Sequence, residues 1–271
     1  MTASRAWVDV RDAADFAAGH LPGTASLPLS AWAERRHEWP PPGTAILVVA
    51  SESSHAHEAA TRLVAAGYTD LAWLDAPWDS LEIPATPGPS ARLWRPAPWL
   101  ERAIAEWPGL IPEGRHRKRA LDIACGTGRD AVFLALAGFE VEAWDHDAAA
   151  LSRAGDLARR HGVSLRLRDI DLETQALPVF ETAAFALVAC FRYLHRPLFP
   201  ALASAVAPGG ILVYETFRVG QERFGKPRRP RFLLRAGELR EAFAGLDVVR
   251  YEEPSPPEGP WTARLIARRP G

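Results

Sequence analysis

Apolar and polar positions alternate along the first third of the chain in a pattern of short strands and amphipathic helices. Apolar runs occupy residues 6–10, 45–49 and 70–74, and amphipathic segments occupy residues 11–19 and 55–67. Short apolar runs bounded by turn residues predict buried strands, and apolar residues three or four positions apart predict helices. The alternation of the two predicts an α/β fold with a mostly parallel sheet.

A second alternation of strands and helices runs from residue 120 to about residue 268, and it ends in a strand pair near 246–253 and 261–268. Between the two halves, residues 83–98 contain five prolines together with glycine and serine. Proline removes a backbone donor and stops helices, so this segment is predicted to be a linker. We therefore predict a domain over residues 1–82, a linker over residues 83–98 and a second α/β domain over residues 99–271.

Composition and charge limit the kinds of partner. The chain is 48% apolar and 24% charged, with a formal net charge of −1, so no overall field steers it to nucleic acid or to an acidic membrane. No apolar run is long enough to cross a bilayer, and the N-terminal residues have no signal-peptide pattern, so we expect a cytoplasmic protein with a small-molecule substrate. The two cysteines, Cys125 and Cys190, suggest small apolar packing rather than a disulfide or a metal site. The oligomeric state is not predicted.

The first half carries a specific motif. Residues 8–29, VDVRDAADFAAGHLPGTASLPL, place Asp9 and Arg11 at a strand end and a Gly-His-x-Pro-Gly turn after the next helix. This segment resembles the opening of a rhodanese domain, and the resemblance covers residues 5 to about 82. It implies a small α/β domain in which a cysteine follows the second long strand and carries sulfur.

The chain departs from the rhodanese pattern at that cysteine. Counting back from Gly67 and Tyr68 places Ala50 at its position, and the family's Gly-Gly near the end reads Ala76-Pro77 here. A methyl group is not a nucleophile, so the resemblance implies a domain without sulfurtransferase activity. Two interpretations of the loop over residues 50–55 remain open: a solvated loop that caps a helix, or a site that recognises an oxyanion without catalysis.

The strongest chemical signal lies in residues 119–151. A strand runs into Gly126 and Gly128 and then a helix, and a second strand ends at Asp145. Glycines let the backbone approach a ligand at a helix N-terminus, and a carboxylate at the next strand end can hold ribose hydroxyls. The spacing also satisfies the looser dinucleotide fingerprint, so an NAD(P)-dependent oxidoreductase stays as an alternative.

Three further features argue against the oxidoreductase. They are Asp122 inside the first strand, a Pro-Gly-Gly turn at residues 208–210 and the terminal strand pair. Together with the glycine loop they resemble the class I S-adenosylmethionine-dependent methyltransferases, and the segments CGTGRD, AWDHD and FLLRAGELREAF are similar to the tellurite-resistance type over residues 118 to about 252. The resemblance implies a Rossmann-like, seven-stranded methyltransferase domain whose cofactor is S-adenosyl-L-methionine.

This resemblance also implies which residues bind the cofactor. Gly126 and Gly128 admit its methionine part, Asp122 orients the ammonium group through backbone or water, and Arg129 meets the carboxylate. Further along the chain, Asp145 holds the ribose, and Asp171 with Leu172 contacts the adenine. Cys190 and Phe191, at the end of the fourth strand, face the cofactor with their backbone carbonyls. Asp169 is an alternative to Asp171, because the third strand's end is uncertain by two residues.

The acceptor side is expected at residues 191–200, FRYLHRPLFP, which follow the fourth strand. Tyr193, His195 and Arg196 are the candidate catalytic residues, with Arg192 beside them. His195 is either a proton acceptor or a helix-start residue bonded to backbone, and both interpretations stay open. Residues 216–238 form a basic insert rich in arginine and phenylalanine, which suits a lid over an anionic substrate.

We therefore expect a methyltransferase that acts on a small anionic or soft-nucleophile acceptor, with the rhodanese-like domain as a regulatory or binding module. An alternative is a non-catalytic sensor that binds the cofactor or an anion without turnover.

Overall fold

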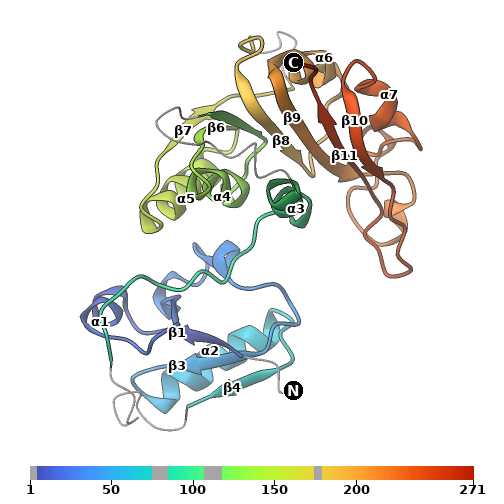
Figure 1. The fold of residues 1–271 in the computed structure, drawn as a ribbon. Helices are drawn as coiled ribbons and strands as arrows, with labels where there is room; N and C mark the ends of the chain where they lie inside the picture. Colours follow the sequence, from blue (N-terminus) through green and yellow to red (C-terminus); the bar gives the residue numbers. More distant parts are fainter. Residues whose placement is uncertain (1–4, 75–84, 107–117, 174–178) are drawn as a thin grey trace. The chain divides into compact units, whose positions relative to one another are not determined.

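The computed structural model describes residues 5–74, 85–106, 118–173 and 179–271, and within it the chain divides into two compact units, Met1–Arg95 and Pro96–Gly271 (Figure 1). The sequence features at Ala76-Pro77 and at residues 83–84 lie outside the described residues. None of the helices in these ranges is long and apolar enough to span a bilayer.

The first unit is a four-stranded parallel sheet in the order β2-β1-β3-β4 (Figure 1). Its elements follow the predicted alternation and are β1 (Ala6–Asp9), α1 (Ala13–Ala18), β2 (Ala25–Ser26), β3 (Ile46–Val49), α2 (Ser53–Ala65) and β4 (Leu71–Trp73). The sequence predicts three of these strands and misses β2, because a two-residue strand is too short to show an alternating pattern.

The turn of this unit is held by a buried charge pair, as the motif predicts. The Arg11 guanidinium donates to both carboxylate oxygens of Asp9, from Nη2 at 2.7 Å and from Nε at 3.0 Å, and Nη2 also donates to the carbonyl of Gly19. Part of the Pro-rich segment packs here as well: the Ala91 N–H donates to the Thr24 carbonyl, and Thr86 pairs with His20. Residues 86–91 therefore belong to the first unit.

The second unit contains a seven-stranded sheet in the order β10-β11-β9-β8-β5-β6-β7, with β11 antiparallel to both of its neighbours (Figure 1). The strands are β5 (Arg119–Ile123), β6 (Glu140–Asp145), β7 (Leu165–Asp169), β8 (Phe185–Phe191), β9 (Val206–Phe217), β10 (Asp247–Glu252) and β11 (Thr262–Arg268). The predicted seven-stranded Rossmann-like sheet and the terminal strand pair are confirmed.

The Pro-Gly-Gly segment does not form a separate turn. Its turn residues predict a break before the next strand, but Pro208–Gly210 lies inside the bounds of β9. Opposite it, the register shifts, since Phe185 pairs with Val206 while Leu187 pairs with Ile211. The turn residues are therefore accommodated as a local irregularity at the beginning of the strand.

Helices cover both faces of this sheet. The helices are α3 (Pro98–Glu106), α4 (Arg129–Leu136), α5 (Ala148–Arg160), α6 (Phe199–Ala205) and α7 (Glu238–Ala242). The apolar sides of α3 and α4 pack on one face, and those of α6 and α7 pack on the other.

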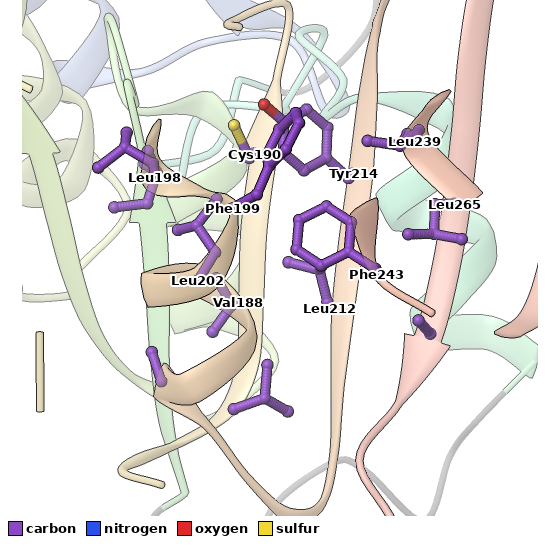
Figure 2. Close-up of a cluster of buried hydrophobic side chains, with 14 of the residues drawn as sticks. Val188, Cys190, Leu198, Phe199, Leu202, Leu212, Tyr214, Leu239, Phe243 and Leu265 are labelled. Carbon is purple, nitrogen blue, oxygen red and sulfur yellow. The ribbon is translucent and has the colours of Figure 1, made fainter. Parts of the chain in front are cut away.

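The core under α6 and α7 is aromatic. Figure 2 shows Phe199, Tyr214 and Phe243 gathered around β8 and β9, with 5.3 Å between the ring centroids of Phe199 and Phe243. The Tyr214 hydroxyl donates to the Tyr193 carbonyl at 2.9 Å, so this core holds the segment that follows β8. The Cys190 side chain is fully buried in the same cluster, where burial raises its pKa to about 12, so it serves as small apolar packing.

The sheet order places the site. Chain order reverses between β5 and β8, because β6 and β7 continue to one side of β5 while β9 follows β8 on the other. In open parallel sheets, ligands bind outside the carboxyl ends of the strands at such a reversal. The residues directly after β5 and β8 are Ala124 and Arg192, and both have a φ of 55°, which is uncommon for residues other than glycine.

Candidate functional site

The loop from β5 to α4 forms the floor of the site. Gly126 has a φ of 54°, and a Cβ built on it would meet no protein atom within 4 Å, so the space above it is open. Gly128 has a φ of 78°, but a Cβ there would lie 2.5 Å from the Cβ of Ala154 in α5. The two glycines therefore have different roles: Gly126 leaves room for a ligand, and Gly128 lets α4 and α5 approach each other.

Asp145, at the end of β6, organises this loop. Its Oδ2 accepts the Gly126 N–H at 2.8 Å, and its Oδ1 accepts the Asp147 N–H at 3.0 Å. The structure thus brings together two residues that the sequence predicts as cofactor ligands. His146, whose side chain is 75% exposed, follows directly and was not singled out from the sequence.

Asp122 lies beneath the loop inside β5. Its side chain is buried, and its Oδ2 has no hydrogen-bond partner among the described residues. Burial, followed by the nearby Asp130, raises the pKa of Asp122 well above its usual value. A buried carboxylate oxygen without a donor is a place where a cationic or N–H-bearing ligand group fits.

The remaining cofactor candidates surround this floor. Arg129 is exposed at the first position of α4. Asp169 is the last residue of β7 and pairs in register with Asp145, while Asp171 lies two residues beyond the strand and accepts the Glu173 N–H. Leu172 is buried in the core beside Asp171. Both Asp169 and Asp171 are exposed at the carboxyl ends of the strands, so both stay as candidates.

The segment after β8 carries the acceptor-side candidates. The Tyr193 hydroxyl is buried and has no hydrogen-bond partner among the described residues, and burial is the main cause that raises the pKa of Tyr193. His195 is the residue before a short 3-10 helix, Arg196–Leu198, and its side chain makes no capping hydrogen bond there. Tyr193 therefore presents an unmatched polar group at this end of the sheet.

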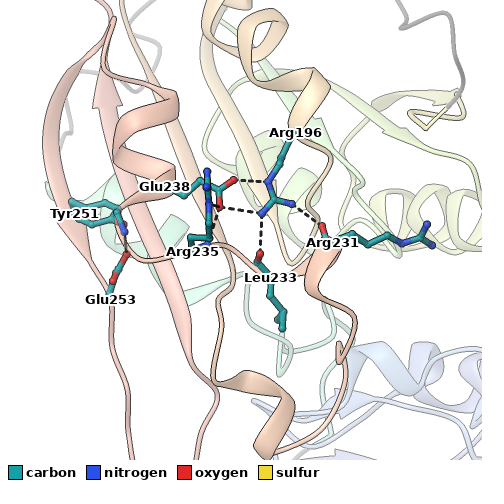
Figure 3. A network of polar contacts seen from close by, with 8 residues as sticks. Arg196, Arg231, Leu233, Arg235, Glu238, Tyr251 and Glu253 are labelled. Atoms are coloured by element: carbon teal, nitrogen blue, oxygen red, sulfur yellow. Dashed lines mark hydrogen bonds and ion pairs between the residues drawn. The ribbon is translucent and has the colours of Figure 1, made fainter.

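The structure gives Arg196 a different role from the predicted one. The sequence predicts that it binds the acceptor, but its guanidinium is already engaged on three sides (Figure 3). It pairs with both carboxylate oxygens of Glu238 and donates to the carbonyl of Arg231 at 2.8 Å and to that of Leu233 at 2.9 Å. Arg196 joins the segment after β8 to the basic insert, and four of its five N–H groups already donate to Glu238 and to the two carbonyls, so it cannot offer an anion a pair of parallel donors.

The basic insert is an ordered structure. The Gln221 side chain accepts the Trp261 N–H at 2.9 Å, and the guanidinium of Arg218 lies 4.7 Å from the centre of the Trp261 ring. Gly220 is required beneath the same ring, because a Cβ on it would lie 2.0 Å from a Trp261 carbon. Arg228 and Arg229 are exposed on this insert.

The first unit has a separate hollow of about 520 Å³ around Ala50. Ala50 is 4% exposed. The charged residues of the wall are mostly acidic, namely Asp12, Asp15, Glu52 and Glu58, with Arg62 paired to Glu58 and Arg11 paired to Asp9. This balance disfavours an oxyanion, so the hollow supports the solvated-loop interpretation rather than anion recognition. Within the described residues, no group of three or more histidine, cysteine, aspartate or glutamate side chains is arranged to hold a metal ion.

Comparisons with known protein families define the class of each unit. Residues 1–82 match the family described as a rhodanese-like domain, and residues 120–210 match the family described as a methyltransferase domain. The chain therefore carries a rhodanese-like domain followed by a methyltransferase domain.

Two individual relatives show how far the likeness extends. Hemagglutinin 1 of Eikenella corrodens is 31% identical over 140 residues, which are 50% of this chain and 46% of the relative, so the match spans about half of that protein. TehB from Haemophilus influenzae superposes with a TM-score of 0.51 at 15% identity, over 64% of this chain and 62% of the other. The likeness to TehB is one of fold.

The residues at the carboxyl ends of β5 and β6 fit S-adenosyl-L-methionine, the cofactor that the resemblance to methyltransferases implies. The open space above Gly126 admits an extended chain against the backbone, and the unpartnered Asp122 oxygen suits an ammonium group. The Asp145 oxygens, held by two N–H groups, keep lone pairs that can accept from ribose hydroxyls.

We expect the protein to show no thiosulfate:cyanide sulfurtransferase activity, because Ala50 supplies no sulfur nucleophile. Ala50→Cys should restore only a trace of thiocyanate formation, since the neighbouring carboxylates raise the pKa of the new thiol, and adding Glu52→Gln should increase that trace. Both variants are assayed with Cys125 and Cys190 replaced by serine. Wild-type sulfurtransferase activity that disappears when Cys125 or Cys190 is replaced by serine would show that the position of Ala50 is misassigned.

Proposed function

We propose that this protein transfers the methyl group of S-adenosylmethionine to a small acceptor that is anionic or a soft nucleophile. The observation that supports this most directly is the convergence of Asp122, Gly126 and Asp145 where the sheet order reverses, beside the buried hydroxyl of Tyr193. The groups for the cofactor and the segment that contains Tyr193 and His195 thus meet at one end of the sheet.

Each cofactor residue has a distinct task in this proposal. Asp145 orients the ribose while it fixes the loop through the Gly126 N–H, and Asp122 receives the ammonium group. Arg129 faces the carboxylate from the start of α4, and the adenine lies near His146, Leu172 and one of Asp169 or Asp171. The carbonyls of Cys190 and Phe191, at the end of β8, line the inner side.

The acceptor is activated mainly by alignment. When bound, the cofactor supplies a methyl carbon already activated by its sulfonium, so the protein needs chiefly to place a nucleophile in line with the C–S bond. Tyr193 and His195 follow β8, where a hydroxyl donor and an imidazole can orient the acceptor and take its proton. No strongly perturbed base is required for a thiolate or an oxyanion.

The basic insert favours an anionic acceptor. Arg228 and Arg229 are exposed, and Arg196 fastens the insert to the segment that contains Tyr193 and His195. Positive charge near the acceptor side raises the local concentration of anions and speeds their association. The rhodanese-like domain is proposed to act as a binding or regulatory module without catalysis.

Calorimetry with S-adenosylhomocysteine tests the proposal. Asp145→Ala should weaken binding by about tenfold or more, because it removes charge-assisted hydrogen bonds to the ribose and releases the Gly126 N–H. Asp147→Ala is the matched control: Asp147 caps α5 through the N–H groups of Ala149 and Ala150, so its loss should lower stability by about 1 kcal/mol and leave affinity unchanged.

Tighter binding of NAD than of S-adenosylhomocysteine would reject the proposal in favour of an oxidoreductase. Binding of the cofactor without methyl transfer to any of a panel of thiols, carboxylates and chalcogen oxyanions would favour the non-catalytic sensor.

A further inference from the structure

Arg192 has a backbone conformation that arginine rarely adopts. Of the residues that the structure describes, three other than glycine have a positive φ: Ala124, Ala183 and Arg192, each at 55°. Ala183 precedes β8 at the far end of the sheet, whereas Ala124 and Arg192 follow the adjacent strands β5 and β8 at the site. Strained residues of this kind concentrate at functional sites, where the surrounding structure holds them in place.

The structure holds Arg192 through its backbone. The Arg192 N–H donates to the Glu215 carbonyl at 2.7 Å, which continues the pairing of β8 with β9 by one residue. Glycine would adopt the same φ without strain, so the backbone does not require arginine here. The presence of arginine points to a use of its side chain.

The Arg192 side chain is available for a ligand. It is exposed, and it makes no hydrogen bond or ion pair with any described residue, in contrast to the fully engaged Arg196. Two carboxylates that its charge affects already have partners, since Asp130 accepts the Ala97 N–H at 2.6 Å and Glu215 is paired with Arg264 at 2.7 Å.

The charge of Arg192 acts on the same two carboxyl groups. Burial raises the pKa of Asp130 and of Glu215, and Arg192 is near enough to lower both. Asp130 is in the first turn of α4, next to the cofactor loop, and Glu215 is in β9 opposite Phe191. Arg192 therefore follows the strand that pairs with β5, next to the cofactor loop.

We propose that Arg192 recognises an oxyanion of the methyl acceptor, of the carboxylate class, and so determines the enzyme's preference for charged acceptors. This proposal rests on the proposed methyltransferase function, and it names the residue that selects the substrate class. The guanidinium is a planar fork that binds a carboxylate through two parallel hydrogen bonds, which a lysine cannot reproduce.

The test compares acceptors that differ only in charge, 3-mercaptopropionate and its neutral amide, with selenite as a second oxyanion. Arg192→Gln should lower kcat/KM for the two anions by about 10- to 100-fold and change that for the amide by less than about threefold. Arg192→Lys should recover part of the loss for the anions. Arg166→Gln removes an exposed charge at the opposite end of the sheet and should change neither.

Two further measurements separate the possible failures. Arg192→Gly should raise the melting temperature, because it relieves the strained φ, while it loses the preference for anions as completely as Arg192→Gln does. The affinity for S-adenosylhomocysteine should be unchanged in both variants; a loss would mean that Arg192 holds the cofactor's carboxylate instead.

Equal losses for the charged and the neutral acceptor, no loss for either, or turnover of the amide alone would overturn the role of Arg192 and leave the methyltransferase proposal intact. Cofactor binding with no transfer to any of the three acceptors would overturn both.

Discussion

Replacing Gly128 by alanine should lower the free energy of unfolding by about 2–5 kcal/mol, the largest effect expected of any single methyl group in the cofactor loop. Two causes add: the residue has a φ of 78°, and its new Cβ would lie 2.5 Å from the Cβ and 3.0 Å from the Cα of Ala154. Chemical denaturation measures the change. Ala154→Gly in the same chain should restore part of the stability, because it removes the nearer of the two contacts.

Gly126→Ala is the matched comparison. Its φ of 54° carries a similar backbone strain of about 1–2 kcal/mol, but no protein atom lies within 4 Å of the new methyl group. The methyl group would occupy space meant for the cofactor, so affinity for S-adenosylhomocysteine should fall by about tenfold or more. If Gly126→Ala proved the less stable variant, or Gly128→Ala folded normally and lost only affinity, the assignment of the two glycines would be reversed.

Glu238→Gln should lower the free energy of unfolding by up to about 3 kcal/mol at neutral pH. Burial alone would raise the pKa of Glu238, but hydrogen bonds from Arg196 and from the backbone N–H of Arg235 prevail and lower it to about 2 (Figure 3). The substitution keeps the shape of the side chain and removes the charge that these donors require. Denaturation of the wild type and the variant in parallel measures the difference.

The same pair makes the effect dependent on pH. A carboxyl group whose pKa is lower in the folded state than in the unfolded state stabilises the fold above its unfolded pKa of about 4.5, and that contribution is lost as the pH falls toward 2. The stability difference between wild type and Glu238→Gln should therefore be largest above about pH 5 and shrink toward zero near pH 2.

Arg231→Ala provides the control for this pair, because Arg196 contacts the carbonyl of Arg231 and not its side chain. It should leave both the stability and its pH dependence unchanged. A difference in unfolding free energy between wild type and Glu238→Gln that stays constant across the pH range would show that the charge of Glu238 contributes nothing to its pairing with Arg196.

The features that the sequence predicts correctly are those written in nearby residues. The strands and helices follow from local apolar spacing, and the meeting of Gly126 with Asp145 follows from the carboxyl ends of two successive parallel strands. The resemblance to two families, carried by Asp9 and Arg11 in one unit and by the glycine loop in the other, extends this to the fold class of each unit and to the seven strands of the second sheet.

Roles that depend on distant partners could not be read from the sequence. Arg196 resembles an anion-binding residue until Glu238 and the carbonyls of residues 231 and 233 are seen around it, more than 30 positions away. The role of Gly128 depends on Ala154, and only the backbone angles single out Arg192. The exact end of β7, on which the choice between Asp169 and Asp171 rests, is equally a property of the folded sheet.

The attachment of the basic insert has a consequence for how new substrate preferences can arise. Arg196 donates to two main-chain carbonyls, those of Arg231 and Leu233, so these two hydrogen bonds do not depend on which side chains occupy those positions. Random libraries confined to exposed insert residues such as Arg228, Arg229 and Arg231 should therefore yield folded proteins at high frequency, even when every charge is reversed. The hydrogen bonds that attach the insert are thus separate from its exposed side chains. Selection for altered acceptors can change those side chains without weakening the attachment.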